Sequence, residues 1–286
     1  MKKNNNYKLV SIVIPTRNSA AFLDSCLKHI RLQTYPNIEI IIVDGKSTDN
    51  VKELSDKYKC EFYTYVPKVS SGIFDAPHKR NYGMKKARGE YVYWLDADME
   101  LSKNLINEAV ELCEKGVDAV ILREDSFGIG IWAKAKQLER RCYWGDDNVE
   151  SPRFFKKSVW HSIGGFDLSL GAGGDDIDLS QKLKEKNFRI GRAKSVVMHN
   201  EGNLSIIKLF KKRFMYGREM VNYLNKRPKS WLSSYNPIKG SYLRNWRLFA
   251  KDPLVFIFFV VMRAVEYFAG FCGMVYNFFQ AKYDKK

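Results

Sequence analysis

Three acidic side chains follow one apolar stretch of this sequence at alternate positions. Residues 91–95 read Tyr-Val-Tyr-Trp-Leu, and Asp96, Asp98 and Glu100 come after them. A continuous apolar run of this length predicts a central strand of a parallel sheet, buried on both faces. Carboxylates just beyond the carboxyl end of such a strand lie where open α/β sheets bind ligands. Oxygen ligands suit Mg²⁺ or Mn²⁺ shared with a phosphate, although a short Asp-x-Asp pattern also fits a polar turn before a helix.

Two earlier predicted strands also end in polar residues. Residues 8–15 form a β-branched strand that ends in a proline, and residues 39–44 form a second strand that ends in a carboxylate. The residues at these two strand ends are Pro15, Thr16, Arg17, Asn18 and Asp44. Polar side chains at several strand ends are stronger evidence for a binding site than any one of them.

Strand and helix patterns alternate through the first two thirds of the chain. This order predicts an α/β fold with a mostly parallel sheet and helices on both faces. We expect Ser19 to cap a helix over 20–34, and Gly89 to end a helix over 78–88. Because crossovers between parallel strands are right-handed, the polar strand ends should gather at one edge of the sheet.

Two later segments also carry residues that could do chemistry. Residues 164–167 read Gly-Gly-Phe-Asp, and residues 175–178 place three aspartates at the start of a predicted helix. His199 follows a strand predicted over 189–197. The glycines would let backbone approach a substrate closely. The aspartates also suit a helix N-terminus through the helix dipole alone.

Taken in order, these motifs resemble the inverting glycosyltransferases of family 2, which have the GT-A (Rossmann-like) fold. The resemblance covers residues 8–200, about two thirds of the chain. It rests on six motifs and the late histidine: Val-Ile-Pro-Thr-Arg-Asn, Ile-Val-Asp-Gly-x-Ser-Thr-Asp, Lys-Arg-Asn-x-Gly, Tyr-x-x-Trp-Leu-Asp-Ala-Asp, Gly-Gly-Phe-Asp and Asp-Asp-x-Asp-Leu.

The resemblance implies a metal-dependent hexosyltransferase. Such an enzyme moves a sugar, with inversion, from a UDP- or GDP-linked donor to a lipid-linked or glycan acceptor, with Mn²⁺ or Mg²⁺ on the diphosphate. The positions that match the family's donor-binding motifs are Pro15, Thr16, Arg17, Asn18, Asp44, Arg80, Asn81, Asp96, Ala97 and Asp98.

The resemblance also assigns the metal ligands and the base. Asp98 matches the direct metal ligand, His199 matches a further metal ligand, and Asp176 matches the base that takes the acceptor's proton. The positions expected near the acceptor and the sugar are Gly165, Phe166 and Asp175. Glu100 fits either the metal site or the dipole of the next helix, and Lys46, two residues after Asp44, fits either phosphate or solvent.

The net charge of +16 calls for an anionic partner or surface. Residues 202–251 hold twelve Lys and Arg against the single acidic residue Glu219, so the excess lies mainly in the C-terminal region. Five cysteines are scattered without a Cys-x-x-Cys pair. They predict buried thiols in a reducing compartment and no zinc site.

The C-terminal region reads as a membrane-associated appendage. Residues 206–224 predict a basic amphipathic helix, and residues 253–279 are apolar apart from Arg263 and Glu266, which could pair. We therefore expect a catalytic domain over 1–203 and a helical region over 204–286 at the cytoplasmic face of a membrane rich in anionic lipid. Interfacial or re-entrant helices, a single span, and a hairpin packed on protein are the alternatives.

Two other functions compete with sugar transfer. A nucleotidyltransferase that makes nucleotide-sugars would need a glycine-rich loop after the first strand, where this chain has Pro15 to Asn18. A non-catalytic binder of lipid or nucleic acid would explain the charge, but no RNA-binding signature or basic repeat appears, so nucleic acid is not an expected partner.

Overall fold

The computed structural model describes residues 7–68, 75–170, 174–227 and 239–283. The chain divides into two compact units whose segments alternate along the sequence. The first contains residues 1–123, 152–166 and 179–198, and the second contains residues 124–151, 167–178 and 199–286. Each unit is described separately below.

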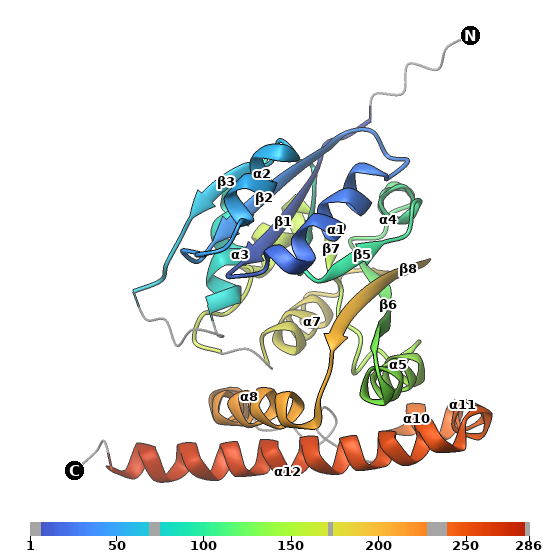
Figure 1. Ribbon diagram of the computed structural model, residues 1–286. Helices are drawn as coiled ribbons and strands as arrows, with labels where there is room; N and C mark the ends of the chain where they lie inside the picture. The colour runs from blue at the N-terminus through green and yellow to red at the C-terminus, as the bar shows by residue number, and fades with distance from the viewer. Residues whose placement is uncertain (1–6, 69–74, 171–173, 228–238, 284–286) are drawn as a thin grey trace. The chain divides into compact units, whose positions relative to one another are not determined.

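An eight-stranded sheet organises the first unit (Figure 1). Its order is β3-β2-β1-β4-β7-β6-β8-β5. Strand β1 pairs in parallel with β2 and β4, β2 pairs in parallel with β3, and β7 is antiparallel to β4 and β6. The strands are β1 (Val10–Thr16), β2 (Ile38–Asp44), β3 (Glu61–Thr64), β4 (Tyr91–Trp94), β5 (Met99–Leu101), β6 (Ala119–Ile129), β7 (Phe154–Lys156) and β8 (Ile190–Asn203). The predicted mostly parallel, mixed α/β sheet is confirmed.

Helices cover both faces of this sheet. Ile12 and Ile14 of β1 belong to one buried cluster with residues of α1 and α4. Val13, which points to the other face, belongs to a second cluster with residues of α3, α6 and α7. The helices are α1 (Ala20–Arg31), α2 (Val51–Lys57), α3 (Ala76–Lys86), α4 (Leu105–Glu114), α6 (Lys157–Ile163) and α7 (Asp175–Glu185). Alternate side chains of the strands thus fill two cores.

The carboxyl ends of β1, β2 and β4 lie along one edge of the sheet. Thr16 is the register partner of Asp44, and Val13 is the partner of Trp94, so Asp96 follows the same edge. This convergence is the arrangement that the sequence predicted.

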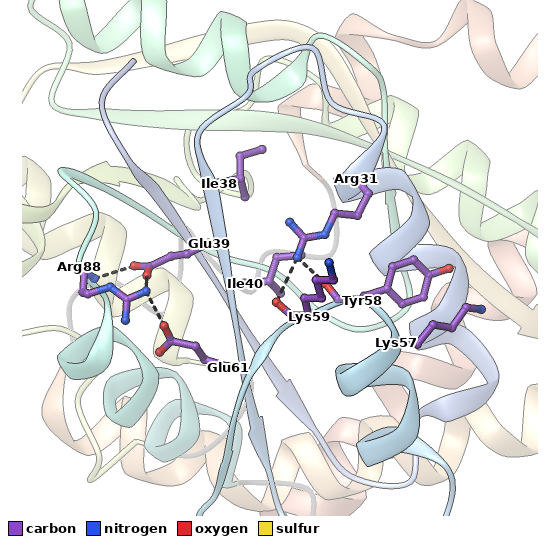
Figure 2. Close-up of a pocket in the computed structure, with 9 residues that line it drawn as sticks. All are labelled: Arg31, Ile38, Glu39, Ile40, Lys57, Tyr58, Lys59, Glu61 and Arg88. Carbon is purple, nitrogen blue, oxygen red and sulfur yellow. Dashed lines mark hydrogen bonds and ion pairs between the residues drawn. The ribbon is translucent and has the colours of Figure 1, made fainter. Parts of the chain in front are cut away.

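A cavity of about 520 Å³ lies at the opposite, amino edge of β2 and β3 (Figure 2). Its two arginines already have protein partners: Arg88 pairs with Glu39 and Glu61, and Arg31 donates to the carbonyl oxygens of Tyr58 and Lys59. This cavity is therefore not the candidate active site.

The second unit is mainly helical. Its helices are α5 (Ile131–Tyr143), α8 (Ile206–Lys226), α10 (Gly240–Arg244), α11 (Arg247–Lys251) and α12 (Pro253–Tyr283). Helices α8 and α12 approach closely, because a Cβ at Gly217 would lie 2.1 Å from the carbonyl oxygen of Gly270. The predicted amphipathic helix and the predicted Arg263–Glu266 pair are both present.

Helix α12 is apolar on two sides. Val255, Phe259, Met262 and Ala269 are buried. The large apolar side chains exposed along its other side are Leu254, Phe256, Ile257, Val260, Val261, Phe268, Phe271, Tyr276, Phe278 and Phe279. Within the described ranges, α12 is the one helix long and apolar enough to cross a membrane, over Pro253–Gln280.

Three local predictions were wrong. The Ser19 hydroxyl accepts from the amide of Arg17 and does not cap α1, whose first amide, that of Ala20, donates to Asp49 instead. Helix α3 ends at Lys86 with Ala87 in extended conformation, before Gly89. The apolar residues 119–122 predict a short strand, but the observed strand β6 continues to Ile129.

Candidate active site

The ends of β1 and β2 are joined by side chains at the predicted nucleoside position. Oδ1 of Asp44 accepts from Oγ1 of Thr16 at 2.9 Å and from Oγ of Ser47 at 2.5 Å, and Oδ2 accepts from the Ser47 amide at 2.8 Å. Asp44 is only 3% exposed. Its carboxylate stabilises the turn after β2 and also lies at the carboxyl edge of the sheet. A structural role in the turn is therefore compatible with a role in ligand binding.

The residues before α1 extend this surface. Asn18 has a left-handed backbone (φ 49°) and accepts from the amide of Thr48 at 2.8 Å, while its own amide donates to Ser47. Arg17 and Asn18 are exposed, and Pro15 is half-buried. The two loops therefore support each other and leave the Arg17 side chain at the surface.

Lys79 is a charged residue that the sequence analysis missed. Its side chain is 3% exposed, and its ammonium donates to the Thr16 carbonyl oxygen and to Asp75, each at 3.0 Å. Burial lowers the pKa of Lys79, against the opposing effect of Asp75 and Asp44. Lys79 ties α3 to the end of β1, and the Lys-Arg-Asn motif was the available signal for it.

The carboxylate of Asp96 binds two arginines. Nη2 of Arg80 lies 2.6 Å from Oδ1, and Nη1 of Arg153 lies 3.0 Å from Oδ2. Burial alone would raise the pKa of Asp96, but the two guanidinium groups hold that pKa well below its usual value. Each guanidinium also lies over the Trp94 ring, 4.2 Å and 4.0 Å from its centroid. The Asp96 carboxylate thus holds both guanidinium groups at the edge of the sheet.

Asp98 and Glu100 follow Asp96 at alternate positions. Asp98 is half-buried just beyond β4. Oε1 of Glu100 accepts from Oγ of Ser25 at 2.5 Å, and Oε2 lies 3.8 Å from His29. Glu100 thus contacts α1. Among the described residues no group of three or more His, Cys, Asp or Glu side chains could hold a metal ion.

Asn81 holds the segment predicted to meet the sugar. Its Nδ2 donates to the carbonyl oxygen of Phe166 at 2.8 Å, and its Oδ1 accepts from the Phe166 amide at 3.0 Å. Gly165 has a left-handed backbone (φ 66°), and a Cβ there would lie 2.7 Å from Oδ1 of Asn81. Only glycine therefore fits this turn without displacing Asn81.

The three aspartates in the first turn of α7, which belong to the second unit, differ in environment. Asp176 is half-buried, and its Oδ1 accepts from the amide of Ile177 at 2.8 Å. Asp178 is fully buried and pairs with Arg227 at 2.7 Å. Asp175 is 5% exposed. Asp178 has a structural ion pair, which leaves Asp176 as the most accessible carboxylate of the three.

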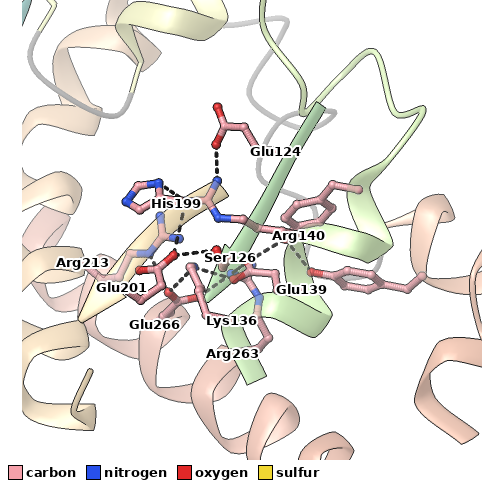
Figure 3. A network of polar contacts seen from close by, with 12 residues as sticks. Glu124, Ser126, Lys136, Glu139, Arg140, His199, Glu201, Arg213, Arg263 and Glu266 are labelled. Carbon is pink, nitrogen blue, oxygen red and sulfur yellow. Dashed lines mark hydrogen bonds and ion pairs between the residues drawn. The ribbon is translucent and has the colours of Figure 1, made fainter. Parts of the chain in front are cut away.

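His199 contacts an arginine in the same unit (Figure 3). Its Nδ1 lies 2.7 Å from Nη2 of Arg140. A guanidinium has no acceptor, so Nδ1 must accept this hydrogen bond. A metal contact by His199 would then have to be made by Nε2, and the predicted metal role stays a prediction.

The sequence is similar to a known protein family and to individual known glycosyltransferases. The model of "Glycosyl transferase family 2" matches residues 11–168, just over half of the sequence. A glycosyltransferase named GlyG, from Streptococcus pneumoniae serotype 4, is 36% identical over 115 residues, which are 40% of this chain and 38% of that protein. Poly(ribitol-phosphate) beta-N-acetylglucosaminyltransferase TarS, from Staphylococcus aureus, is 26% identical over 114 residues, 39% of this chain and 20% of that protein. The matches thus span about two fifths or less of these curated relatives.

Solved structures share the fold. The mannosyltransferase PcManGT from Pyrobaculum calidifontis, in complex with GDP-Man and Mn²⁺, superposes with a TM-score of 0.65 at 17% identity, covering 96% of this chain and 88% of that one. The structure of S. aureus TarS gives a TM-score of 0.51 at 16% identity, covering 93% of this chain and 55% of that one. At these identities the likeness establishes the GT-A fold.

Proposed function

Because the chain belongs to glycosyl transferase family 2, we propose that it transfers a hexosyl group from a UDP- or GDP-linked donor to a lipid-linked or glycan acceptor, with inversion. The observation that carries the proposal is the convergence of Asp44, Arg80 and Asp96 at one sheet edge. These are the positions of the family's donor motifs. A nucleotidyltransferase is not supported, because β1 ends in Pro15, Thr16, Arg17 and Asn18 without a glycine-rich loop.

The donor would bind along this edge. The Asp44 end suits the nucleoside, because its carboxylate can accept hydrogen bonds from a base. The Arg80 and Arg153 end suits the diphosphate, because a guanidinium matches phosphate oxygens in geometry and charge. Asn81 would set the Gly165–Phe166 backbone that meets the sugar.

Asp98 could hold a divalent ion, because its carboxylate is the type of ligand that Mg²⁺ and Mn²⁺ prefer. Mg²⁺ and Mn²⁺ are commonly held by one or two carboxylates together with substrate phosphates and water, and Asp98 is a half-buried carboxylate just beyond β4. When bound, the ion neutralises charge on the diphosphate. The solved mannosyltransferase of this fold, which holds GDP-Man and Mn²⁺, supports a divalent ion as the cofactor.

We assign the proton transfer to Asp176. Its carboxylate takes the proton from the acceptor hydroxyl while that oxygen bonds to the anomeric carbon from the side opposite the diphosphate. The bond between the anomeric carbon and the diphosphate oxygen breaks, and its electron pair leaves with the nucleotide. A single displacement of this kind inverts the configuration. Arg80 and Arg153 stabilise the negative charge that grows on the leaving oxygen.

The C-terminal helices would bind the cytoplasmic surface of an anionic membrane. The exposed apolar side of α12 offers a surface for lipid, and Lys208, Lys211 and Lys212 of α8 are exposed. The buried ion pairs of Arg263 and Glu266 with α5 and α8 favour a helix that keeps this side against protein over a free-standing span.

The test of the proposed function is a donor screen. The purified protein of residues 1–286, mixed with UDP- and GDP-hexoses, should bind at least one donor and release its nucleoside diphosphate in Mn²⁺ or Mg²⁺. Absence of binding to every UDP- and GDP-hexose, with a folded protein, would contradict the proposal.

A further inference from the structure

The segment that carries the proposed base is attached to the end of α8. Residues 167–178 and α8 both belong to the second unit, so the contacts between them lie within one compact unit. Three residues at or directly after the end of α8 each contact one part of the segment. The contacts are Lys226 with Asp167, Tyr223 with Gly174, and Arg227 with Asp178. The end of α8 therefore supports the segment in three places.

Arg227 binds a carboxylate that is shielded from water. The Asp178 side chain is 0% exposed, and Nε of Arg227 lies 2.7 Å from its Oδ1. The amide of Arg227 donates to the Tyr223 carbonyl oxygen at 2.8 Å, so its backbone is fixed to the last turn of α8. Removal of one partner from a buried pair is strongly unfavourable, because it leaves a charge without its counterion. Arg227 therefore holds Asp178 inside the second unit.

The inward direction of Asp178 determines the direction of Asp176. Residues two positions apart in an α-helix lie about 200° apart around its axis, and the Asp178 amide donates to the Gly174 carbonyl oxygen at 2.9 Å, as in a helical turn. Asp178 is fully buried, whereas Asp176 is half-buried. The Asp176 carbonyl oxygen also accepts from Oγ of Ser151, a residue of the same unit, at 3.0 Å. A turn that is fixed through Asp178 thus presents the Asp176 carboxylate on its other side.

Tyr223 gives the same turn a second support. A Cβ at Gly174 would lie 2.8 Å from Cδ2 of Tyr223 and 2.9 Å from its Cβ and Cγ. Tyr223 itself is 1% exposed. Only a residue without a side chain allows so close an approach. The backbone just before α7 therefore packs directly on Tyr223, one helical turn before Arg227.

Lys226 makes a weaker contact beside Arg227. The Lys226 side chain is 44% exposed, and its partner Asp167 is 16% exposed. Ion pairs with an exposed partner contribute little to stability, because solvent screens them. Lys226 is thus a matched control for Arg227: it is the adjacent cation and binds the same segment, but its partner is not fully buried.

We propose that Arg227 is a positioning residue for the proton transfer: its guanidinium holds Asp178 inside the unit and thereby directs the Asp176 carboxylate to the acceptor hydroxyl. The role of Asp176 as the base rests on the proposed function. The attachment of the turn to Arg227 depends only on the contacts within the second unit.

The first experiment measures this attachment without a substrate. Hydrogen exchange of the Asp178 amide is followed by NMR in the protein of residues 1–286, in Arg227→Met and in Lys226→Met. We expect exchange to be at least about tenfold faster in Arg227→Met and less than about threefold faster in Lys226→Met. Unchanged exchange in Arg227→Met, or an equal increase in both variants, would overturn the proposal.

The second experiment separates positioning from donor binding. Binding of UDP and GDP measures affinity, and release of UDP or GDP from the hexose donors in Mn²⁺ measures turnover. Arg227→Met should lower kcat at least about tenfold and change the affinity for the nucleoside diphosphate by less than about threefold. Arg227→Lys, which keeps the charge, should recover part of kcat, and Lys226→Met should keep kcat within about threefold of the wild-type value. A wild-type kcat in Arg227→Met, or a loss of affinity as large as the loss of kcat, would refute the proposal.

A double variant separates positioning from stability, and it also serves if Arg227→Met alone does not fold. Arg227→Met combined with Asp178→Asn removes both charges of the pair, so urea unfolding should show that most of the lost stability returns. The kcat should stay at least about tenfold low, because the turn is no longer held. Recovery of kcat together with stability would show that Arg227 only stabilises the fold, against the proposal. If no hexose donor is bound or cleaved by the wild-type protein, the proposed function fails, and the exchange measurement still decides the attachment.

Discussion

Nη1 of Arg153 lies 3.0 Å from Oδ2 of Asp96, and this contact brings a residue from β7 into the candidate donor site. Strand β7 runs antiparallel to β4, with Phe154 opposite Tyr93, so Arg153 comes next to Trp94. The Trp94 amide donates to the Arg153 carbonyl oxygen at 3.2 Å. The candidate site lies at the carboxyl ends of parallel strands, and the antiparallel strand β7 brings Arg153 into it.

Removal of Arg153 should weaken both the fold and donor binding. Arg153→Met leaves Asp96 with Arg80 alone, and we expect the free energy of unfolding to fall by about 1–3 kcal/mol in urea titrations. Arg88→Met is a matched control, because Arg88 pairs with Glu39 and Glu61 but is 62% exposed at the amino edge. That change should cost about 0–1 kcal/mol. Equal losses for the two variants would contradict the role given to Arg153.

The Asp96 ion pairs should make stability sensitive to acid. The pKa of Asp96 is lower in the folded chain than its ordinary value of 3.8. Its contribution is therefore fully present above that value and is lost as pH falls toward the folded pKa. The stability difference between the wild-type protein and Asp96→Asn should be largest near neutral pH and shrink below about pH 4. Urea unfolding from pH 7 to pH 3 measures it, and a difference that grows on acidification would argue against the pairing.

Mn²⁺ affinity should depend on Asp98 and not on Glu100. Asp98→Asn removes the proposed carboxylate ligand, and we expect Mn²⁺ affinity in the presence of a nucleoside diphosphate to fall at least about tenfold. Glu100→Gln provides the control two residues away, because Glu100 contacts Ser25 and lies near His29. It should change Mn²⁺ affinity by less than about threefold. A larger loss in Glu100→Gln than in Asp98→Asn would reverse the assignment.

Membrane binding should depend on the exposed side of α12. Phe268 and Phe271 are 62% and 60% exposed, and changing both to Ser should weaken binding to vesicles with phosphatidylglycerol about tenfold or more. Val66→Ser, which alters an exposed apolar residue elsewhere, should have little effect. Flotation at increasing salt should also show weaker binding, because the basic residues of α8 contribute. Unchanged flotation of the double variant would rule out α12 as the lipid contact.

The sequence predicted the sheet and the strand ends well, because long apolar runs such as Tyr91–Trp94 followed by polar residues have few other interpretations. The Ser19 cap was wrong for a tertiary reason. Asp49, from the loop after β2, reaches the first amide of α1 and replaces the expected local bond. A helix cap is predicted only from residues close in the sequence, so a partner from another loop cannot be predicted in this way.

Arg153, Lys79 and Arg140 escaped prediction for a related reason. Arg153 meets Asp96 across 57 residues, and Arg140 meets His199 across 59. Neither pair has a local spacing that sequence patterns detect, and Lys79 is buried although its residue type usually lies at the surface. The assigned roles of Asp176 and His199 come from motif order and stay predictions.

The most direct measurement is sugar transfer by Asp176→Asn, with the donor that the screen identifies and its acceptor. The variant keeps the shape of the side chain and should still bind the nucleoside diphosphate with Mn²⁺, while kcat falls by about 10²-fold or more because the base is gone. The product made by the wild-type protein should have inverted anomeric configuration. Full transfer activity in Asp176→Asn, or retained configuration in the wild-type product, would contradict the mechanism.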